Sequence, residues 1–205
     1  MPLFITFEGC EGCGKSTQAR SLHRELSKIS SGVVLLHEPG GTELGNRIRY
    51  LLKWAKKVPI SPVSELLLFN ASRANLMDVV IRPALKRGET VICDRFTDST
   101  LAYQGYGRGL DLGLVRTACG IATQGLKPDL TILLDIPVEE GLRRKALQAG
   151  LDRFEQTDSS FHRRVREGYL RMAREEPSRW LVVDGTKSKS EIGNIIWQKV
   201  KEMVK

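Results

Sequence analysis

Nine consecutive residues near the amino end of the chain combine three glycines with a lysine and two hydroxyl side chains. They are Gly9, Cys10, Glu11, Gly12, Cys13, Gly14, Lys15, Ser16 and Thr17, in the pattern GxxxxGK[ST]. Glycines let backbone N–H groups surround phosphate oxygens, and the helix that follows such a loop directs its positive dipole end at them. We expect Lys15 to bridge the terminal phosphates of a nucleoside triphosphate as a catalytic residue, and the Ser16 hydroxyl to bind Mg²⁺. The loop alone does not identify the acceptor of the phosphoryl group.

The same loop carries two cysteines in a CxxC spacing. Metal and redox sites use this spacing, but no second CxxC or Cys/His pair accompanies Cys10 and Cys13. We therefore interpret them, with Cys93 and Cys119, as reduced and mostly packed side chains. Oxidation of Cys10 and Cys13 to a disulfide is expected to distort the loop and inhibit the protein.

Short apolar runs alternate with longer segments of helical period along the chain. The runs are residues 4–7, 33–36, 90–93, 130–134 and 180–183. The helical segments are residues 16–30, 43–56, 62–87, two within 99–124, 138–149, 158–174 and 190–204. Uniformly apolar runs indicate buried strands, and their alternation with helices predicts a five-stranded parallel sheet flanked by helices. This is the α/β, three-layer fold of P-loop NTPases, which binds ligands at the carboxyl ends of the strands.

Composition and charge restrict the class of protein. The 205 residues are 41% hydrophobic and 27% charged, which indicates a folded globular chain, and we expect residues 1–205 to form a single domain. No apolar run approaches the ~18 residues of a membrane span, and the first eight residues lack a basic leader. We therefore expect a cytoplasmic protein without a membrane partner. The net charge of +8 leaves nucleic acid, an anionic surface or a phosphorylated substrate as candidates.

Further motifs follow the predicted strands or lie on the helices beside them. They are EPGGT at residues 38–42, FNASR at 69–73, DRF at 94–96, STLAYQ at 99–104 and GRG at 107–109. Together with Glu11 in the loop, they resemble bacterial thymidylate kinases over essentially the whole chain. The resemblance implies that ATP donates its γ-phosphoryl group to dTMP, giving dTDP and ADP with Mg²⁺, and that the protein is a homodimer.

The resemblance also assigns the residues that hold the base. Phe69 is expected to stack on the thymine ring, because an offset aromatic contact suits a planar base. Arg73 lies one helical turn further on, where it can reach the base edge. Pro39 forms the opposite apolar wall, while Tyr103 lies near the sugar and Gln104 near the base.

The acceptor phosphate and the metal have their own candidates. Arg49 and Arg95 are expected to grip the phosphate, because a guanidinium fork matches phosphate oxygens, and Arg95 is counted as catalytic. Ser99 lines the same pocket. Glu11 either accepts the 3′-hydroxyl of the sugar or lies close to the metal. For the carboxylate that holds Mg²⁺ through water we prefer Asp94, although residue 135 is also an aspartate in a similar place after the fourth strand.

A basic segment at about residues 142–155 follows the fourth predicted strand. In the thymidylate kinase family this segment is a lid over the donor phosphates. One class of the family carries an arginine in the phosphate loop, where this chain has Gly12, so the resemblance implies that the lid supplies the catalytic arginine. Arg153 is the first candidate, followed by Arg143 or Arg144.

Two alternatives remain open from the sequence. The first is another small kinase, acting on dUMP, dCMP or a deoxynucleoside. The second is a nucleic-acid-binding P-loop ATPase, which only the positive charge suggests. The chain has no signature of a nucleic-acid-binding module, so we expect no nucleic acid partner.

Overall fold

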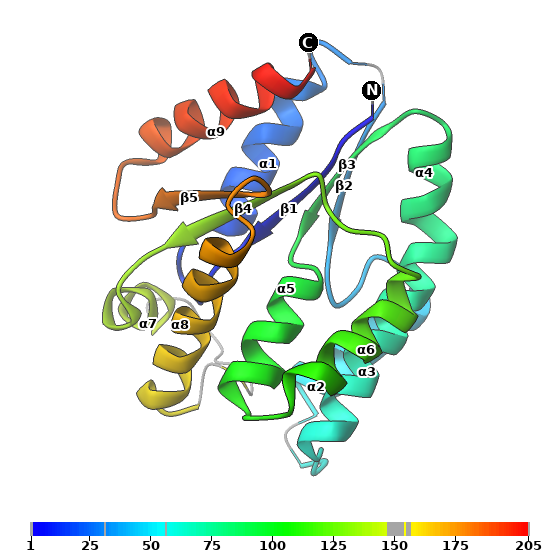
Figure 1. Ribbon diagram of the computed structural model, residues 1–205, viewed down its shortest axis with the longest axis vertical. Helices are drawn as coiled ribbons and strands as arrows, with labels where there is room; N and C mark the ends of the chain where they lie inside the picture. The colour runs from blue at the N-terminus through cyan, green and yellow to red at the C-terminus, as the bar shows by residue number, and fades with distance from the viewer. Residues whose placement is uncertain (1, 31, 56, 147–153, 155–156, 205) are drawn as a thin grey trace.

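A five-stranded parallel sheet forms the middle layer of the computed structural model, which describes residues 2–30, 32–55, 57–146, 154 and 157–204. Its strands are β1 (Phe4–Glu8), β2 (Val33–His37), β3 (Thr90–Asp94), β4 (Leu130–Asp135) and β5 (Trp180–Asp184). Their spatial order is β2-β3-β1-β4-β5, and every pairing is parallel (Figure 1). The central strand β1 is buried along its whole length, because strands flank both of its edges and helices cover both faces of the sheet.

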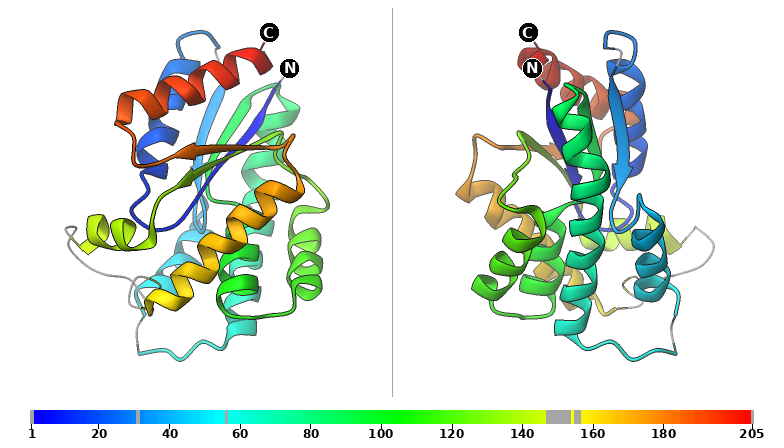
Figure 2. Two further views of the ribbon diagram at one scale, coloured as in Figure 1. Left: turned by 60° about the vertical axis from the view of Figure 1, so that its left-hand side comes forward. Right: turned by 90° about the vertical axis from the view of Figure 1, so that its right-hand side faces the viewer.

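Two helices cover one face of the sheet (Figure 2). They are α1 (Lys15–Leu26), which starts directly after the phosphate loop, and α9 (Lys189–Val204). Leu22 of α1 and Ile196 of α9 pack with Ile5 of the central strand in one buried cluster. The start of α1 is thereby fixed relative to β1, and this fixes the loop between them.

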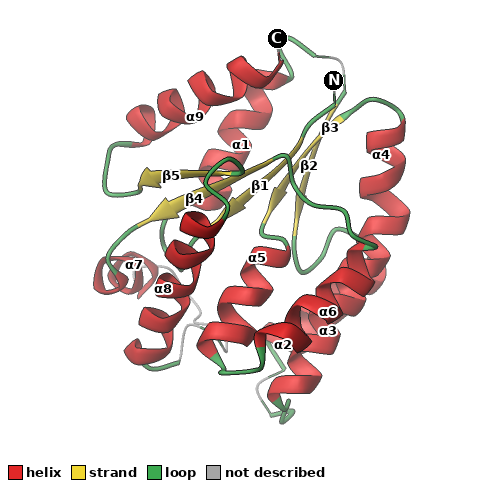
Figure 3. Ribbon diagram, viewed as in Figure 1, coloured by secondary structure: helices red, strands yellow, loops and turns green. Residues whose placement is uncertain are grey.

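A long helical rod covers part of the opposite face (Figure 3). It consists of α3 (Pro62–Leu76), the π-helical turn η1 (Met77–Ile81) and α4 (Arg82–Lys86), which follow one another without a break. Its buried residues pack against Phe4 and Val91 of the sheet. The helix predicted over residues 62–87 is present as this rod.

The rest of that face is covered by elements that come from two distant parts of the chain. α5 (Thr97–Thr100) continues into the π-helical η2 (Leu101–Gly107), and α8 (Ser159–Glu175) packs against η2. Tyr169 of α8 shares a buried cluster with Leu133 of β4. This packing brings α8 close to the end of β1.

Three shorter helices complete the described structure. α2 (Glu43–Lys53) and α6 (Leu112–Thr123) both pack against α3, and α7 (Val138–Ala146) follows β4. Thr42 and Asp111 cap the first two helices by accepting from N–H groups three residues on, at 3.0 and 2.8 Å. The final residues of the helix predicted over 138–149 lie outside the described part of the chain.

The predicted α/β fold is confirmed by this arrangement. The register places Phe7 of β1 and His37 of β2 on either side of Asp94 of β3, so the segments that leave these three strands begin next to one another. Within the described residues, no helix has both the length and the apolar character that crossing a bilayer requires.

Candidate active site

The backbone of α7 packs closely against the phosphate loop. Gly12 has a positive φ of 69°, and a Cβ atom at this position would lie 2.2 Å from the carbonyl oxygen of Gly141. A Cβ on Gly141 would in turn lie 2.4 Å from the carbonyl oxygen of Glu11. Each glycine therefore permits a close approach of two backbones, and no larger side chain fits at either position unless α7 moves.

Lys15 lies folded over the loop and is only 7% exposed. Its ammonium group donates to the carbonyl oxygens of Gly9 at 3.0 Å and Cys10 at 2.8 Å, and to Cys13 Sγ at 3.4 Å. These neutral acceptors hold the charge at the loop without cancelling it. The ammonium group is therefore held in place to meet phosphate oxygens.

Ser16 and Asp94 are in direct contact. The Ser16 hydroxyl donates to Asp94 Oδ2, whereas Asp135 forms a two-bond ion pair with Arg166 at 2.7 and 2.8 Å. The described residues contain no group of three or more His, Cys, Asp and Glu side chains that could hold a metal ion by themselves. The hydroxyl and the carboxylate are hard oxygen donors that suit Mg²⁺, which keeps several waters and takes phosphate oxygens as further ligands.

Arg95 is the centre of a second charged group. Its backbone has a positive φ of 75°, which is uncommon for a residue with a side chain. Nη2 donates to Glu11 Oε1 at 3.0 Å and to Tyr103 OH at 3.1 Å, and Nη1 donates to Ser99 Oγ at 3.0 Å and to Tyr169 OH at 3.2 Å. Burial raises the pKa of Glu11, but the charges of Arg95 and other cations outweigh it, so this pKa lies well below its ordinary value.

One cavity of about 660 Å³ connects these groups. The phosphate loop lines it through Lys15 and Ser16, and Arg95 lines it together with Phe69 and Tyr103. A single space thus adjoins a loop suited to one phosphate chain and an arginine suited to another. This arrangement favours phosphoryl transfer between two nucleotides over simple hydrolysis.

Comparison with known proteins agrees with this interpretation. The family model for thymidylate kinase matches residues 7–196. The chain belongs to the thymidylate kinase family. The chain is 54% identical to a thymidylate kinase of Dehalococcoides mccartyi, over 100% of this chain and 99% of the relative. It is 50% identical to one of Deinococcus radiodurans, over 98% of this chain and 97% of the relative. A crystal structure of the thymidylate kinase from Ehrlichia chaffeensis aligns with a TM-score of 0.80 and 35% identity, covering 97% and 98% of the two chains. The predicted family and the predicted dTMP kinase, a phosphotransferase, are confirmed.

Most residues that the sequence assigned to this thymidylate kinase site line the cavity. They are Glu11, Gly12, Gly14, Lys15, Ser16, Thr17, Pro39, Arg49, Phe69, Arg73, Asp94, Arg95, Ser99, Tyr103 and Gln104. Gly9, Cys10 and Cys13 are not among the lining residues of the cavity. Arg49 donates to the Pro39 carbonyl oxygen at 2.9 Å, which places this cation beside the predicted apolar wall.

The base side of the cavity is aromatic. Phe69 is half-buried, and its ring centroid lies 5.8 Å from that of Phe154, which in turn lies 6.2 Å from that of Tyr103. Gln104 is buried, and its amide donates to Glu65 Oε1 at 2.8 Å. The acidic side chain of Glu65 therefore fixes the orientation of the Gln104 amide.

Arg73 is buried beneath this side of the cavity and is only 1% exposed. It makes five hydrogen bonds, as many as its N–H groups. The acceptors are Glu38 Oε2 at 2.8 Å, Asn70 Oδ1 at 3.0 Å, the Phe96 carbonyl oxygen at 3.1 Å, Thr100 Oγ1 at 2.9 Å and Cys119 Sγ at 3.7 Å. A contact of Arg73 with a base must therefore share or replace one of these bonds, and the long bond to sulfur is the weakest.

The lid candidates lie in different surroundings. Arg143 is on the surface of α7, where it donates to Glu140 at 2.9 and 3.0 Å, and it does not line the cavity. Arg144 binds Glu140 at 2.7 Å and the Gly185 carbonyl oxygen at 3.1 Å. Arg153, the first candidate, lies outside the described residues.

Several residues of this site were not singled out from the sequence. Thr100 lines the cavity, and Glu8 and Tyr169 hold the residues around Arg95. A carboxylate at the end of an otherwise apolar strand was a usable signal for Glu8. Tyr169 lies in a helix with many charged residues, and its sequence neighbours give no signal of its role.

The two loop cysteines are reduced and buried in different clusters. Cys10 packs with the cluster that contains Tyr103, and Cys13 packs with the one that contains Ile5. Burial raises the pKa of the Cys10 thiol to about 12, so the reactive thiolate is scarce at neutral pH. Oxidation of Cys10 and Cys13 to a disulfide is therefore expected to be slow while the loop keeps this conformation.

The buried ion pair of Arg73 and Glu38 makes a prediction for stability. Burial raises the pKa of Glu38 to about 7, and the charge of Arg73 acts in the opposite direction. Arg73→Met should lower the free energy of unfolding by about 3–5 kcal/mol, because it leaves a buried carboxylate without its cation. Above the ordinary pKa of a glutamate, the unfolded chain has released the Glu38 proton, whereas the folded variant still holds it. The folded variant is therefore destabilised as the pH rises, and the stability that Arg73→Met loses should be larger at pH 8 than at pH 5. Urea unfolding at both pH values measures this difference.

The double variant Arg73→Met/Glu38→Gln is the control, because it removes the titrating group. Its free energy of unfolding should fall less between pH 5 and pH 8 than that of Arg73→Met, because no carboxyl group remains at residue 38 to titrate. A loss in Arg73→Met that is equal at both pH values would contradict the assignment of Glu38 as the group left unpaired.

Proposed function

We propose that this protein transfers the γ-phosphoryl group of ATP to dTMP in the cavity described above, giving dTDP and ADP as a step of dTTP biosynthesis. The observation that carries the proposal is the shared cavity, which adjoins Lys15 and Ser16 at one part and Arg95 and Phe69 at another. One nucleotide can therefore present its terminal phosphate to the phosphate of the other. The reaction needs neither a nucleic acid nor a membrane partner.

The acceptor is held by its base, sugar and phosphate separately. Phe69 stacks on thymine, Pro39 forms the opposite wall, and Arg73 and Gln104 lie at the base edge. Tyr103, bonded to Glu11, lies at the sugar. Aromatic stacking supplies affinity for a planar base, while the buried polar groups supply specificity, since an unmatched base would leave them without partners.

Two arginines and a hydroxyl serve the acceptor phosphate. Arg95 and Arg49 bind its oxygens, and Ser99 supports Arg95 from beside it. Because the two arginines come from different elements, α2 and the end of β3, they approach the phosphate from different directions. This fixes the position of the dTMP phosphate oxygen that attacks the γ-phosphorus of ATP.

The donor triphosphate lies in the loop of residues 9–17. Lys15 contacts its β- and γ-phosphates, and Mg²⁺ is held by the Ser16 hydroxyl and, through water, by Asp94. Asp135 is unsuited to this role because Arg166 occupies both of its oxygens. The metal supplies charge compensation for the phosphates.

The chemical step needs no covalent intermediate on the protein. A phosphate oxygen of dTMP attacks the γ-phosphorus in line, and no general base is required because the acceptor is already an anion. The chain contributes position, exclusion of water and positive charge. Arg153, in the lid at about residues 142–155, supplies charge to the transferred group. Arg143 is the second candidate and would have to leave Glu140 to reach it.

The whole chain is proposed to act as one catalytic domain in the cytoplasm. The sheet runs from β2 to β5 without interruption, and both the loop and the lid follow strands of this sheet. Its four cysteines are free and buried, in keeping with a reducing compartment.

We also propose that the protein is a homodimer that associates through α3 and α6. These neighbouring helices expose large apolar side chains, namely Val63, Leu67, Leu114 and Ile121, which are 46%, 57%, 49% and 75% exposed. Exposed apolar residues on neighbouring helices favour self-association, since burying them removes that area from water.

The function is tested by coupled ADP release with a panel of acceptors. We expect kcat/KM for dTMP to exceed that for dCMP by at least about a hundredfold, because the buried polar groups match only one base. Equal rates with the two nucleotides would contradict the proposal.

Phe69→Ala should raise KM for dTMP about tenfold and leave KM for ATP within twofold. Val79→Ala, at an exposed position on the same helical rod, is the matched control.

The role of the lid is tested with two arginines. Arg153→Ala should lower kcat at least about a hundredfold with little change in nucleotide affinity, because the group acts in the transition state. Arg163→Ala removes a surface arginine that pairs with Glu139, and it should leave kcat nearly unchanged. Nearly wild-type turnover in Arg153→Ala would transfer the role to Arg143 or Arg144.

The proposed dimer is tested by sedimentation velocity. Leu67→Glu places a charge in the apolar face and should shift the protein from dimer to monomer. Val79→Glu, an equally exposed position outside the face, should remain dimeric. A wild-type protein that sediments as a monomer, or a Leu67→Glu protein that stays a dimer, would contradict the interface.

A further inference from the structure

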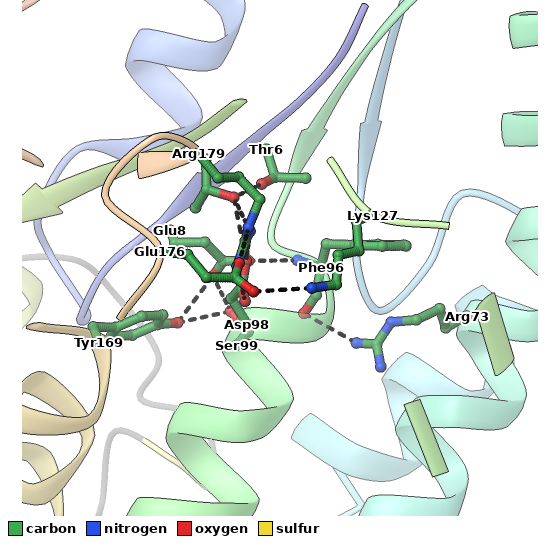
Figure 4. Close-up of polar contacts among 11 residues, drawn as sticks. Thr6, Glu8, Arg73, Phe96, Asp98, Ser99, Lys127, Tyr169, Glu176 and Arg179 are labelled. Carbon is green, nitrogen blue, oxygen red and sulfur yellow. Dashed lines mark hydrogen bonds and ion pairs between the residues drawn. The ribbon is translucent and has the colours of Figure 1, made fainter. Parts of the chain in front are cut away.

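Glu8 is a carboxylate that is fully buried at the end of the central strand, and it does not line the cavity. Its Oε1 atom accepts from the Phe96 N–H at 2.8 Å. Its Oε2 atom accepts from the Ser99 hydroxyl at 2.5 Å and from the Tyr169 hydroxyl at 3.0 Å (Figure 4). Three elements therefore meet at this side chain, namely the turn after β3, the start of α5 and the middle of α8.

The two hydroxyls that donate to Glu8 also contact Arg95. Nη1 of Arg95 donates to Ser99 Oγ at 3.0 Å and to Tyr169 OH at 3.2 Å. A hydroxyl has one proton to donate, so a hydroxyl that gives its proton to Glu8 presents only lone pairs elsewhere. The Ser99 and Tyr169 oxygens also lie 2.8 Å apart, so the two protons are shared among Glu8 and the two hydroxyls, and both oxygens accept from the guanidinium group.

Arg95 needs such support because its backbone is in an unfavourable conformation. Its φ of 75° lies in the left-handed region, which a residue with a side chain adopts only when its surroundings hold it there. Nη2 of the same side chain faces Glu11 and Tyr103, which line the cavity, whereas Glu8 and Tyr169 do not. Nη1 binds one residue that lines the cavity, Ser99, and one that does not, Tyr169, so this nitrogen connects the cavity wall with the interior.

The position of Ser99 is fixed from the side away from the cavity. Its neighbour Asp98 forms an ion pair with Arg179, at 2.7 Å for Oδ2 and 3.1 Å for Oδ1, and Asp98 also accepts from Thr131 at 3.2 Å (Figure 4). The start of α5 is therefore tied to the edge of the sheet at β4 and β5. This leaves the hydroxyl of Ser99 little freedom to turn away from Glu8.

Glu8 is best suited to this role in its ionised form. Burial, followed by the charge of Asp98, raises the pKa of Glu8 to about 7, while the Ser99 hydrogen bond, Arg95 and the Phe96 N–H act against this rise. Three donors converge on its two oxygens, and only the carboxylate accepts from all of them without offering a proton in return.

We propose that Glu8, acting through the hydroxyls of Ser99 and Tyr169, positions Arg95 for the acceptor phosphate. Glu8 and Tyr169 are positioning residues, since neither lines the cavity in which the substrates bind. This inference rests on the proposed function, because it takes Arg95 to bind the phosphate of dTMP. It adds that α8, the helix directly after the lid segment, contributes to acceptor binding through one hydroxyl.

The test compares two tyrosine-to-phenylalanine variants. Tyr169→Phe removes the hydroxyl that links Glu8 to Arg95 and keeps the ring. Tyr106→Phe is the matched control, because the Tyr106 hydroxyl is buried without a hydrogen-bond partner in the part of the chain that is described, and its ring packs against Gly168 of the same helix α8. Isothermal titration measures the Kd of dTMP and of thymidine, which lacks the phosphate.

Tyr169→Phe should weaken dTMP binding about three- to tenfold, as expected for one lost hydrogen bond near a charge, and leave thymidine binding within twofold. Tyr106→Phe should change neither Kd. A Tyr169→Phe protein that binds dTMP as the wild-type protein does, or that loses affinity equally for dTMP and thymidine, would overturn the inference. An equal loss would indicate a general structural defect.

Glu8→Gln tests whether the Glu8 carboxylate is the group that supports dTMP binding by Arg95. Its amide nitrogen is a donor where the carboxylate accepts, so the two hydroxyls lose an acceptor for their protons and Arg95 loses the nearby negative charge. The ratio of dTMP to thymidine affinity should fall at least tenfold, and adding Tyr169→Phe to Glu8→Gln should weaken dTMP binding by less than the product of the two single effects. A fully multiplicative double variant would show that Glu8 and Tyr169 act separately. Should Glu8→Gln not fold, a cycle of Ser99→Ala and Tyr169→Phe tests whether the two hydroxyls that bind Glu8 act together on Arg95.

The affinity ratio separates this inference from the proposed function. Failure of the wild-type protein to phosphorylate dTMP would overturn the proposed function. A wild-type protein that does so, with unchanged affinity ratios in both Tyr169→Phe and Glu8→Gln, would overturn only the role of Glu8.

Discussion

A guanidinium group that is largely withdrawn from water must find an acceptor for each of its N–H groups, and Arg95 is where this requirement shapes the site most. Glu11 and Tyr103 meet one of its terminal nitrogens, and Ser99 and Tyr169 meet the other. These partners come from the phosphate loop, from α5 and η2, and from α8. The same set of bonds therefore fixes the loop, the acceptor pocket and the helix after the lid relative to one another.

Such a site has its charges in place before any substrate arrives. Lys15 is held by carbonyl oxygens, Arg95 by a carboxylate and hydroxyls, and Arg73 by Glu38. Because these groups are already oriented, the protein has little rearrangement to make when charge moves from one phosphate chain to the other. Burying these cations lowers the free energy of unfolding, and the packing of the sheet offsets this loss.

The sequence was most informative where local pattern decides structure. Five uniformly apolar runs predicted the strands, and the GxxxxGKS pattern located the phosphate loop. The prediction that all five strands are buried was wrong for β2 and β5, which are only partly buried because they lie at the edges of the sheet. Resemblance to a family identified the residues that line the cavity. The helix predicted over 62–87 is present, although its pattern did not reveal the π-helical turn at Met77–Ile81, which depends on tertiary packing.

Partners that are distant in the sequence could not be predicted. Glu8 and Tyr169 are 161 residues apart and meet only because α8 returns across the sheet. The choice between Asp94 and Asp135 was open from the sequence, because both follow apolar strands, and it is the pairing of Asp135 with Arg166 that distinguishes them. Likewise, the resemblance assigned Arg73 to a base edge, whereas four of the five acceptors that surround it come from three other segments of the chain.

The contact of Gly12 with Gly141 restricts the substitutions that the phosphate loop can accept. Their backbones touch, so a side chain at residue 12 is admitted only after α7 has shifted. An arginine at residue 12 of this chain would disturb both the loop and α7. A single substitution therefore cannot place a side chain there, because a second change that moves α7 has to accompany it.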